Sequence, residues 1–332
     1  MRPLIDLHGR RIRYLRISIT DRCNLRCRYC MPLSGIRWVP HERVLSYEEM
    51  LRILRICIKR GVEKVRITGG EPLLRKGIVD FISQVNTIDG LRDLTLTTNG
   101  ILLEPMALQL KEAGLRRVNV SLDTLDAEKF AYITHVDAFH EVIRGICAAH
   151  EQGLSPVKIN AVAIRGFNDG EISDFAQLTM TLPLQVRFIE LMPIGCITKY
   201  PENENISATQ IKESIEQRFG PLETLERGLG PAWIYRIPGA RGSIGLIGAL
   251  SERDFCGSCN RIRITATGNL RPCLFSEEHI DLLGPMRGGI LDEELEALIE
   301  EGVRRKPSGH GVCRGMELFH EAGRARMSDI GG

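Results

Sequence analysis

The 332-residue chain lacks any run of about 20 apolar residues, the length that a membrane-spanning helix requires. Its start carries an acid, Asp6, where a signal peptide has its apolar core, so no export signal is expected. The formal net charge is only +2, which argues against a general nucleic-acid binder. Low-complexity segments are also absent. These absences favour a cytoplasmic globular protein with neither a membrane nor a nucleic acid as its partner.

The sequence does contain ten cysteines. A disulfide framework is not expected in a cytoplasmic protein of this size. Cys57 and Cys147 fall within helical apolar patterns and are predicted to be buried core thiols. Cys196 and Cys313 are isolated. The remaining six cysteines form two clusters, which need a chemical explanation.

Strand and helix patterns alternate through the first two-thirds of the chain. Six β/α units imply a parallel sheet covered by helices, and they fall short of the eight units of a closed barrel. The predicted fold is therefore α/β, a partial open (β/α)6 barrel with its ligands at the carboxyl ends of the strands. Strands are predicted at 13–19, 64–68, 93–98, 117–121, 157–163 and 186–190, and helices at 47–59, 78–85, 105–113, 127–133, 139–152 and 172–179.

The alternation stops near Pro193, and a polar stretch follows at 199–205. Beyond it the sequence predicts one helix at 208–218 and short strands that include 232–237 and 261–265. We therefore expect two domains. Residues 1–194 form the barrel, and residues 195–332 form a smaller α+β domain.

The first cysteine cluster follows the first predicted strand as Cys23, Cys27 and Cys30, with the spacing C-x3-C-x2-C. Three thiolates on one loop can hold three irons of a four-iron cluster and leave the fourth iron open for a ligand. A zinc knuckle is the alternative, but zinc favours C-x2-C pairs with a second pair elsewhere. The triplet is identified as the signature of the radical S-adenosylmethionine (SAM) superfamily. That resemblance implies that the open iron binds SAM and that reductive cleavage yields a 5′-deoxyadenosyl radical.

Further residues resemble the SAM-binding elements of that superfamily. Tyr29 occupies the aromatic position inside the triplet, and Thr68-Gly-Gly-Glu-Pro72 follows the second predicted strand. Glycines allow close approach of the backbone to a ligand, although glycine-rich loops at strand ends are common on their own. The resemblance implies SAM contacts from Tyr29, Gly70, Ser121 and Met192.

The second cluster consists of Cys256, Cys259 and Cys273, with the spacing C-x2-C-x13-C. Such a pair opens many zinc ribbons, so a zinc site is a stronger alternative here than at the first cluster. Its fourth ligand would be Cys313 or His310.

The residues around this cluster carry a closer resemblance. Phe-Cys-x2-Cys-Asn-Arg-x-Arg-x-Thr, then Gly, then Cys-Leu-Phe resembles the GTP 3′,8-cyclase family, also known as molybdenum cofactor biosynthesis protein A. The similarity runs nearly end to end and includes Thr-Thr-Asn-Gly at 97–100 and Met-Ser-Asp-Ile-Gly-Gly at 327–332. It implies a second four-iron cluster on Cys256, Cys259 and Cys273, whose open iron binds guanine. It also implies GTP contacts from Arg16, Arg66, Thr97, Lys158, Arg261, Ile262 and Arg263.

Strand geometry bears on the last three of these residues. Arg261 and Arg263 lie two apart, so they share one face of a strand while Ile262 lies on the other and can reach GTP only through its backbone. The resemblance assigns catalytic roles to Arg261, Arg263, Gly331 and Gly332. Most chain ends fray, but the resemblance favours a Gly-Gly tail that reaches the active site.

The family implies radical chemistry on GTP. The 5′-deoxyadenosyl radical removes the ribose H3′, and C3′ closes onto guanine C8 to give (8S)-3′,8-cyclo-7,8-dihydroguanosine 5′-triphosphate, the first step of molybdenum cofactor biosynthesis. The expected cofactors are two [4Fe-4S] clusters and SAM. The expected partners are GTP, a low-potential electron donor, the downstream cyclic pyranopterin monophosphate synthase and, as one option, a second copy of the chain.

Three alternatives stay open at this point. A radical SAM enzyme acting on another substrate, such as a peptide, usually carries more C-terminal cysteines. An electron-transfer protein with two clusters would have four cysteines for each cluster. A zinc-binding regulatory module would differ from both in its metal content.

Overall fold

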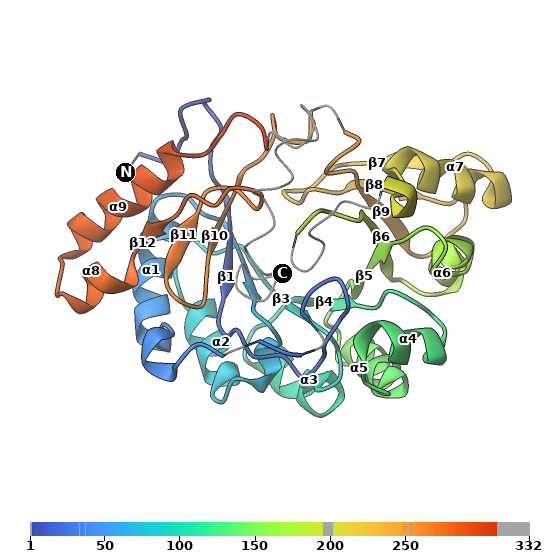
Figure 1. Ribbon diagram of the computed structural model, residues 1–332, viewed down its shortest axis with the longest axis horizontal. Coiled ribbons are helices and arrows are strands. Elements are labelled where there is room, and N and C mark those ends of the chain that lie inside the picture. Colours follow the sequence, from blue (N-terminus) through green and yellow to red (C-terminus); the bar gives the residue numbers. More distant parts are fainter. Residues whose placement is uncertain (1, 33, 37, 195–201, 253, 311–332) are drawn as a thin grey trace.

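The structure is a computed structural model that describes residues 2–310 apart from 33, 37, 195–201 and 253. Its strands are β1 (Tyr14–Ser18), β2 (Lys64–Thr68), β3 (Asp93–Thr98), β4 (Arg117–Ser121), β5 (Lys158–Ala163), β6 (Gln185–Glu190), β7 (Glu223–Leu225), β8 (Trp233–Arg236), β9 (Ser243–Ile247), β10 (Arg261–Ile264), β11 (Asn269–Arg271) and β12 (Ile280–Asp281). They form one sheet in the order β12-β11-β10-β1-β2-β3-β4-β5-β6-β9-β8-β7 (Figure 1).

The middle of this sheet is parallel. Strands β1 to β6 pair in chain order, β10 joins beside β1, and β9 joins beside β6, all in parallel. At both ends the sheet continues with antiparallel strands. The edge strands β12 and β7 do not pair with each other in the described chain, so the predicted partial open barrel is confirmed. Strands from the C-terminal third thus extend the barrel sheet on both sides.

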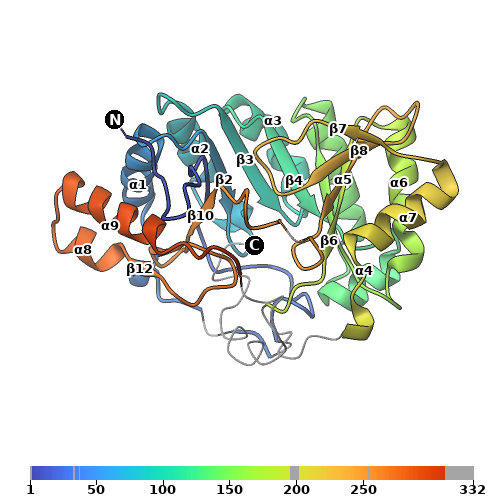
Figure 2. The same ribbon diagram turned by 90° about the horizontal axis from the view of Figure 1, so that it is seen from above.

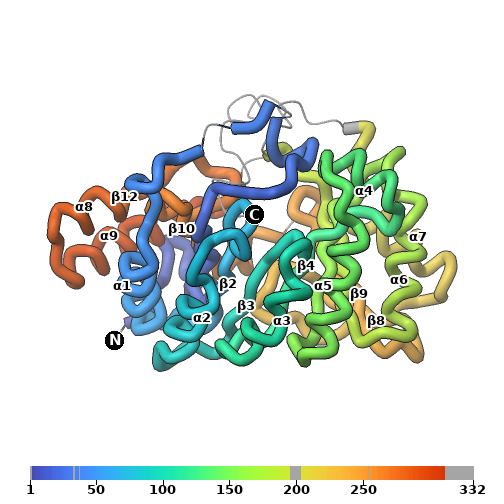
Figure 3. Tube along the Cα trace, turned by 90° about the horizontal axis from the view of Figure 1, so that it is seen from below, coloured from blue at the N-terminus to red at the C-terminus, as the bar shows by residue number. Residues whose placement is uncertain are grey.

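Helices cover the outer face of the sheet. Figures 2 and 3 show α1, α2, α3, α5 and α6 in chain order along this side, and α9 packs on α1. No helix in the described chain combines the length and the apolar character that crossing a membrane requires. The helices are α1 (Tyr47–Lys59), α2 (Ile78–Asn86), α3 (Leu103–Glu112), α4 (Ala127–Thr134), α5 (Phe139–Glu151), α6 (Ile172–Thr181), α7 (Ala208–Phe219), α8 (Leu283–Arg287) and α9 (Asp292–Arg304), with short 3-10 turns at His41–Arg43, Pro72–Leu74, Asp169–Glu171 and Glu202–Glu204.

Two sequence-based predictions were wrong. The C-terminal third contains α8 and α9 in addition to the one predicted helix, although α9 buries Leu295, Ile299 and Val303 at the spacing typical of an amphipathic helix. Cys147 is exposed rather than buried, because the buried face of α5 runs through Ile146 and its helical neighbours. The prediction for Cys57 is confirmed: its side chain is fully buried, and this burial raises the pKa of its thiol to about 12.

Alternation along each parallel strand creates the interior of the barrel. On β1, Leu15 and Ile17 are fully buried in the hydrophobic core, which places Arg16 on the opposite, inner face. The strand register sets Arg16 beside Arg66 of β2 on one side and Arg263 of β10 on the other. The parallel sheet therefore lines its concave face, here called the lumen, with charged side chains.

Candidate active site

One cavity lies at the carboxyl ends of the parallel strands. It encloses about 310 Å³, and its wall contains residues from both cysteine clusters. All six cluster cysteines line it, as do the predicted SAM residues Tyr29, Gly70, Ser121 and Met192 and the predicted GTP residues Arg16, Arg66, Thr97, Arg261 and Arg263. The fold thus brings together residues that are more than 200 positions apart in the sequence.

Backbone hydrogen bonds attach the first cysteine loop to the end of α4. The loop's Arg26 and Arg28 amides donate to the carbonyls of Thr134 and Ile133 at the end of α4, each at 3.0 Å. Burial raises the pKa of Cys23, and it raises that of Cys27 well above the usual value. Both thiols therefore lose their protons at a cost that a bound cation must offset.

The Gly-Gly segment packs directly against the start of that loop. The Gly70 amide donates to the Thr20 carbonyl at 2.7 Å, and the Glu71 amide donates to the Arg22 carbonyl at 2.7 Å. A Cβ on Gly70 would lie 2.3 Å from the Arg22 carbonyl oxygen, so no larger residue fits there. Glycine at position 70 is therefore required for the approach of two loops, in addition to its predicted place beside SAM.

A buried carboxylate anchors the tyrosine of the first triplet. The Tyr29 hydroxyl donates to Asp123 at 2.6 Å, and the Val162 amide donates to the other oxygen of Asp123 at 2.8 Å. Burial raises the pKa of Asp123, and burial together with the charge of Asp123 raises the pKa of Tyr29 well above its usual value. Asp123 was not predicted from the sequence, although its position just after a predicted strand end was a usable signal.

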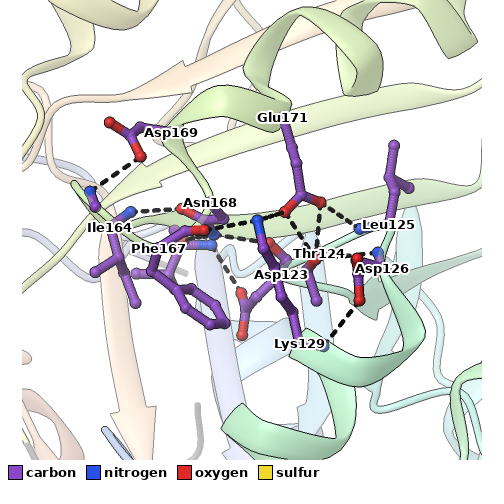
Figure 4. Close-up of polar contacts among 12 residues, drawn as sticks. Asp123, Thr124, Leu125, Asp126, Lys129, Ile164, Phe167, Asn168, Asp169 and Glu171 are labelled. Atoms are coloured by element: carbon purple, nitrogen blue, oxygen red, sulfur yellow. Dashed lines mark hydrogen bonds and ion pairs between the residues drawn. The ribbon is translucent and has the colours of Figure 1, made fainter.

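The loops behind Asp123 are bound to each other by a polar network (Figure 4). Asn168 donates to the carbonyl oxygens of Asp123 and Val162, at 2.7 and 2.8 Å. Glu171 accepts from the Thr124 hydroxyl at 2.7 Å and from the Lys129 ammonium at 2.7 Å. This network fixes the loop that follows β4 and with it the carboxylate that holds Tyr29.

The second cysteine loop has a different electrostatic setting. Burial opposes ionisation of Cys259, but the charges of Arg261 and Lys306 outweigh it and lower the pKa of this thiol to about 6. Burial raises the pKa of Cys256, whose sulfur accepts the backbone N–H of His310. This triplet thus includes one thiol that is already inclined to be a thiolate.

Each triplet supplies three thiolates, the donor set that suits a four-iron cluster with one open iron. Within the described residues, no three His, Cys, Asp or Glu side chains lie close enough together to bind one metal ion. A zinc site needs its ligands around one ion at about 2.0–2.3 Å, whereas a four-iron cluster takes one thiolate for each iron. The ring of His310, one proposed zinc ligand, contacts the Ala249 carbonyl at 2.8 Å and packs on Phe275. Cys313, the other, lies outside the described residues.

Below the cysteines, the lumen holds an excess of buried positive charge. Within the described chain, buried polar atoms without a hydrogen-bond partner include Arg16 Nε and Arg263 Nη1. The carboxylate of Asp93 pairs with Lys64 at 2.8 Å and with Arg117. Buried cations are costly unless an anion compensates them, so this surface fits a polyanionic ligand. The buried basic residues on the inner face are Lys64, Arg66, Lys158, Arg187 and Arg263, and the half-buried Arg16 lies between Arg66 and Arg263.

The pKa shifts of these groups report the same excess. Burial, and then the charge of Arg263, lower the pKa of Arg16 well below its usual value. Burial, and then the charge of Arg187, lower the pKa of Lys158 to about 5. Burial, and then neighbouring Arg66, lower the pKa of Arg187 itself to about 9. A polyphosphate would reverse these shifts, because it would stabilise the charged forms.

Lys158 lies apart from the other predicted GTP residues. It lines a second cavity of about 490 Å³ at the amino ends of the strands, with Lys64, Arg117 and Arg187. Arg187 lines both cavities and thus lies between the cavity with the cysteines and the cavity with Lys158. Three basic residues that line this second cavity were not predicted from the sequence: Lys64, Arg117 and Arg187. Lys64 lies two residues before Arg66, so these two side chains share one face of a strand, as Arg261 and Arg263 do.

Ile262 and the Gly-Gly tail complete the predicted set. The Ile262 side chain is fully buried in the hydrophobic core, opposite the lumen, so it is open to a ligand only through its backbone. Gly331 and Gly332 lie outside the described residues. The last described residue, His310, lines the cavity that contains the cysteines.

Comparisons with known proteins divide the chain into two matched regions. Residues 17–179 match the model of the Radical SAM superfamily, and residues 184–312 match that of Molybdenum Cofactor Synthesis C. The GTP 3′,8-cyclase of Desulforamulus reducens is 47% identical over 331 residues, covering 99% of this chain and 100% of the relative. That of Heliobacterium modesticaldum is 48% identical over 332 residues, with 99% and 100% covered.

Among solved structures, Streptococcus suis SuiB bound to S-adenosylmethionine is similar, with a TM-score of 0.62. The match covers 96% of this chain and 72% of SuiB. At 16% sequence identity, this likeness shows a shared fold and no more.

Proposed function

The chain belongs to the GTP 3′,8-cyclase family of radical SAM enzymes, and from this premise we propose that it cyclises GTP as the first step of molybdenum cofactor biosynthesis. The observation that carries the substrate assignment is the set of buried basic side chains on the inner face of the sheet, which line the cavity with both cysteine triplets and the cavity with Lys158. A triphosphate supplies several negative charges, and Arg and Lys side chains bind phosphate oxygens through charge-assisted hydrogen bonds.

The proposed cofactors are SAM and two four-iron clusters, one on Cys23, Cys27 and Cys30 and the other on Cys256, Cys259 and Cys273. When bound, the first cluster and SAM supply the 5′-deoxyadenosyl radical, which takes H3′ of GTP and becomes 5′-deoxyadenosine. The C3′ radical forms a bond to guanine C8, and one electron and one proton then complete (8S)-3′,8-cyclo-7,8-dihydroguanosine 5′-triphosphate. The second cluster is proposed to hold guanine.

The residues of the chain have positioning roles in this proposal. Tyr29, fixed by Asp123, and Gly70 border the space for SAM, with Ser121 and Met192 on the same wall. Arg16, Arg66 and Lys158 hold the triphosphate from the lumen, Thr97 lines the cavity between them and the cysteines, and Ile262 contributes its backbone. Arg261 and Arg263 lie beside the second triplet and are proposed, with Gly331 and Gly332, to act at the reacting ribose. Holding the reactants in one geometry is the principal contribution of such a protein.

The remaining partners follow from the chemistry. A low-potential donor must supply electrons, and cyclic pyranopterin monophosphate synthase is the proposed consumer of the product. A peptide substrate is a weaker alternative, because it would not supply the concentrated negative charge that the buried cations of the lumen require.

The test is an anaerobic assay of the reconstituted enzyme with SAM, a low-potential reductant and GTP deuterated at C3′. We expect 5′-deoxyadenosine to form in a GTP-dependent manner and to carry the deuterium. ATP in place of GTP is the matched substrate control. SAM cleavage that does not depend on GTP would support the radical chemistry and contradict GTP as the substrate. 5′-Deoxyadenosine without deuterium would contradict H3′ as the hydrogen that is removed.

A further inference from the structure

A buried lysine joins the two arms of the second cysteine triplet. Lys306 follows α9 and is only 3% exposed. Its ammonium donates to the carbonyl oxygens of Arg261 and Pro272, both at 2.8 Å. Arg261 lies two residues after Cys259, and Pro272 directly precedes Cys273. One side chain thus links the two chain segments on which the triplet is built.

The charge of this ammonium acts on the triplet itself. Lys306 and Cys259 line the same cavity, and the positive charge of Lys306 is one of the causes that lower the pKa of this thiol. An ammonium has three donors, and the two carbonyls account for two of them. In the described chain these contacts include no carboxylate. A buried cation needs a compensating anion, and the negative charge at hand is that of cysteine thiolates.

A second buried cation holds the same triplet but has its own counterion. Arg10 donates to the Cys256 carbonyl at 2.8 Å and to the Pro307 carbonyl at 2.5 Å. It is also paired with Asp6 at 2.6 Å, so its charge is already balanced. Arg10 and Lys306 therefore make similar carbonyl contacts, and only Lys306 has its charge directed at a cysteine.

We propose that Lys306 is a positioning residue that provides the counter-charge of the second iron–sulfur cluster and favours its reduced state. This inference rests on the second cluster of the proposed function. Net charge and hydrogen bonds to the sulfurs set the reduction potential of such clusters, and a nearby cation stabilises the added electron. In the first triplet, the charges from described residues that act on Cys23 and Cys27 include no lysine.

The test is a redox titration of reconstituted, full-length enzyme followed by electron paramagnetic resonance. The second-cluster signal is assigned by its loss from a C256A/C259A/C273A variant. Lys306→Gln keeps two N–H donors and removes the charge, whereas Lys306→Arg keeps the charge. We expect a more negative midpoint potential of the second cluster in K306Q, a near-normal one in K306R, and an unchanged first cluster in both. The D6N/R10Q double variant removes a neutral ion pair from the same triplet and should leave the midpoint potential unchanged.

Several results would overturn the inference. These are an unchanged midpoint potential in K306Q with full iron content, equal shifts in K306Q and K306R, or an equal shift in the D6N/R10Q control. Loss of second-cluster iron from both Lys306 variants would also reject a role of charge, whereas loss from K306Q alone would support it. If the unsubstituted enzyme shows no second cluster, the proposed function itself fails, and the role of Lys306 fails with it.

Discussion

The two faces of the parallel strands are both buried, yet they have opposite effects on stability. On β1, Leu15 packs in the hydrophobic core, where burial of apolar surface stabilises the fold. Its neighbour Arg16 is half-buried in the lumen and has a buried, unpartnered Nε, where burial of charge costs stability. A ligand that compensates this charge returns that free energy as binding affinity. On the same strand, Leu15 therefore contributes to stability and its neighbour Arg16 contributes to ligand binding.

The largest expected effect is on the outer face. Leu15→Ala should lower the free energy of unfolding by about 2–5 kcal/mol, because it removes fully buried methyl groups and leaves a cavity. Denaturant unfolding of the protein without ligands measures this change. The KM for GTP of the folded variant should stay near normal. A large rise in KM would contradict the separate roles of the two faces in stability and ligand binding.

The second-largest effect is expected on the lumen face, where one substitution should lower GTP affinity and raise stability. Arg16→Met should weaken GTP binding by about 10- to 150-fold, because a charged hydrogen bond is worth about 1.5–3 kcal/mol. The same substitution should raise the thermal stability of the ligand-free protein, because it removes a charged group whose buried Nε has no hydrogen-bond partner.

Equilibrium binding and thermal unfolding, measured on the same preparation, check both signs. Arg13→Met is the control on the same segment, because Arg13 pairs with Glu63 at 2.7 Å and lies outside the cavity walls. An R16M variant with lower stability and normal GTP affinity would show that the guanidinium is structural.

Lys158 gives a pH-dependent version of the same contrast. With a pKa of about 5 in the folded state and an ordinary value of about 10.4 when unfolded, it takes up a proton on unfolding between these pH values. The stability of the ligand-free protein should therefore rise with pH across this window, by about 1.4 kcal/mol per pH unit from this group. Lys158→Met should flatten the dependence.

Unfolding in denaturant at several pH values between about 6 and 9 measures the difference between the two proteins. Calorimetry in buffers of different ionisation enthalpy should also show proton uptake on GTP binding that is lost in K158M. Parallel stability curves for the two proteins would mean that Lys158 is already charged without a ligand.

The smallest effect is expected at Ile262. Ile262→Val should cost about 0.5–1.5 kcal/mol of stability, because one buried methylene is lost on the outer face. The backbone is unchanged, so KM for GTP should be unchanged in a steady-state assay. A rise in KM would place the side chain in the site and contradict the assignment of faces.

Local patterns were sufficient to predict the six β/α units and the outward direction of Ile262. They failed for β9, whose Gly245 interrupts the strand pattern. In the structure, a Cβ on Gly245 would lie 2.9 Å from Cγ of Arg187, so the glycine makes room for a buried arginine. Lys64 could have been predicted from the alternation of side chains between the two faces of β2. Arg10 and Lys306 could not be predicted from local patterns, because their contacts with the second triplet depend on tertiary packing between segments far apart in the chain.

The pairing of β1 with β10 also has a consequence for biosynthesis of the chain. β1 leaves the ribosome well before β10, because more than 200 residues separate these paired strands in the chain. At about 5–20 residues per second, the open side of β1 stays without its neighbour for on the order of tens of seconds. An exposed strand edge is a template for aggregation during this interval. Nascent chains truncated before β10 should therefore depend on chaperones more than the finished protein does.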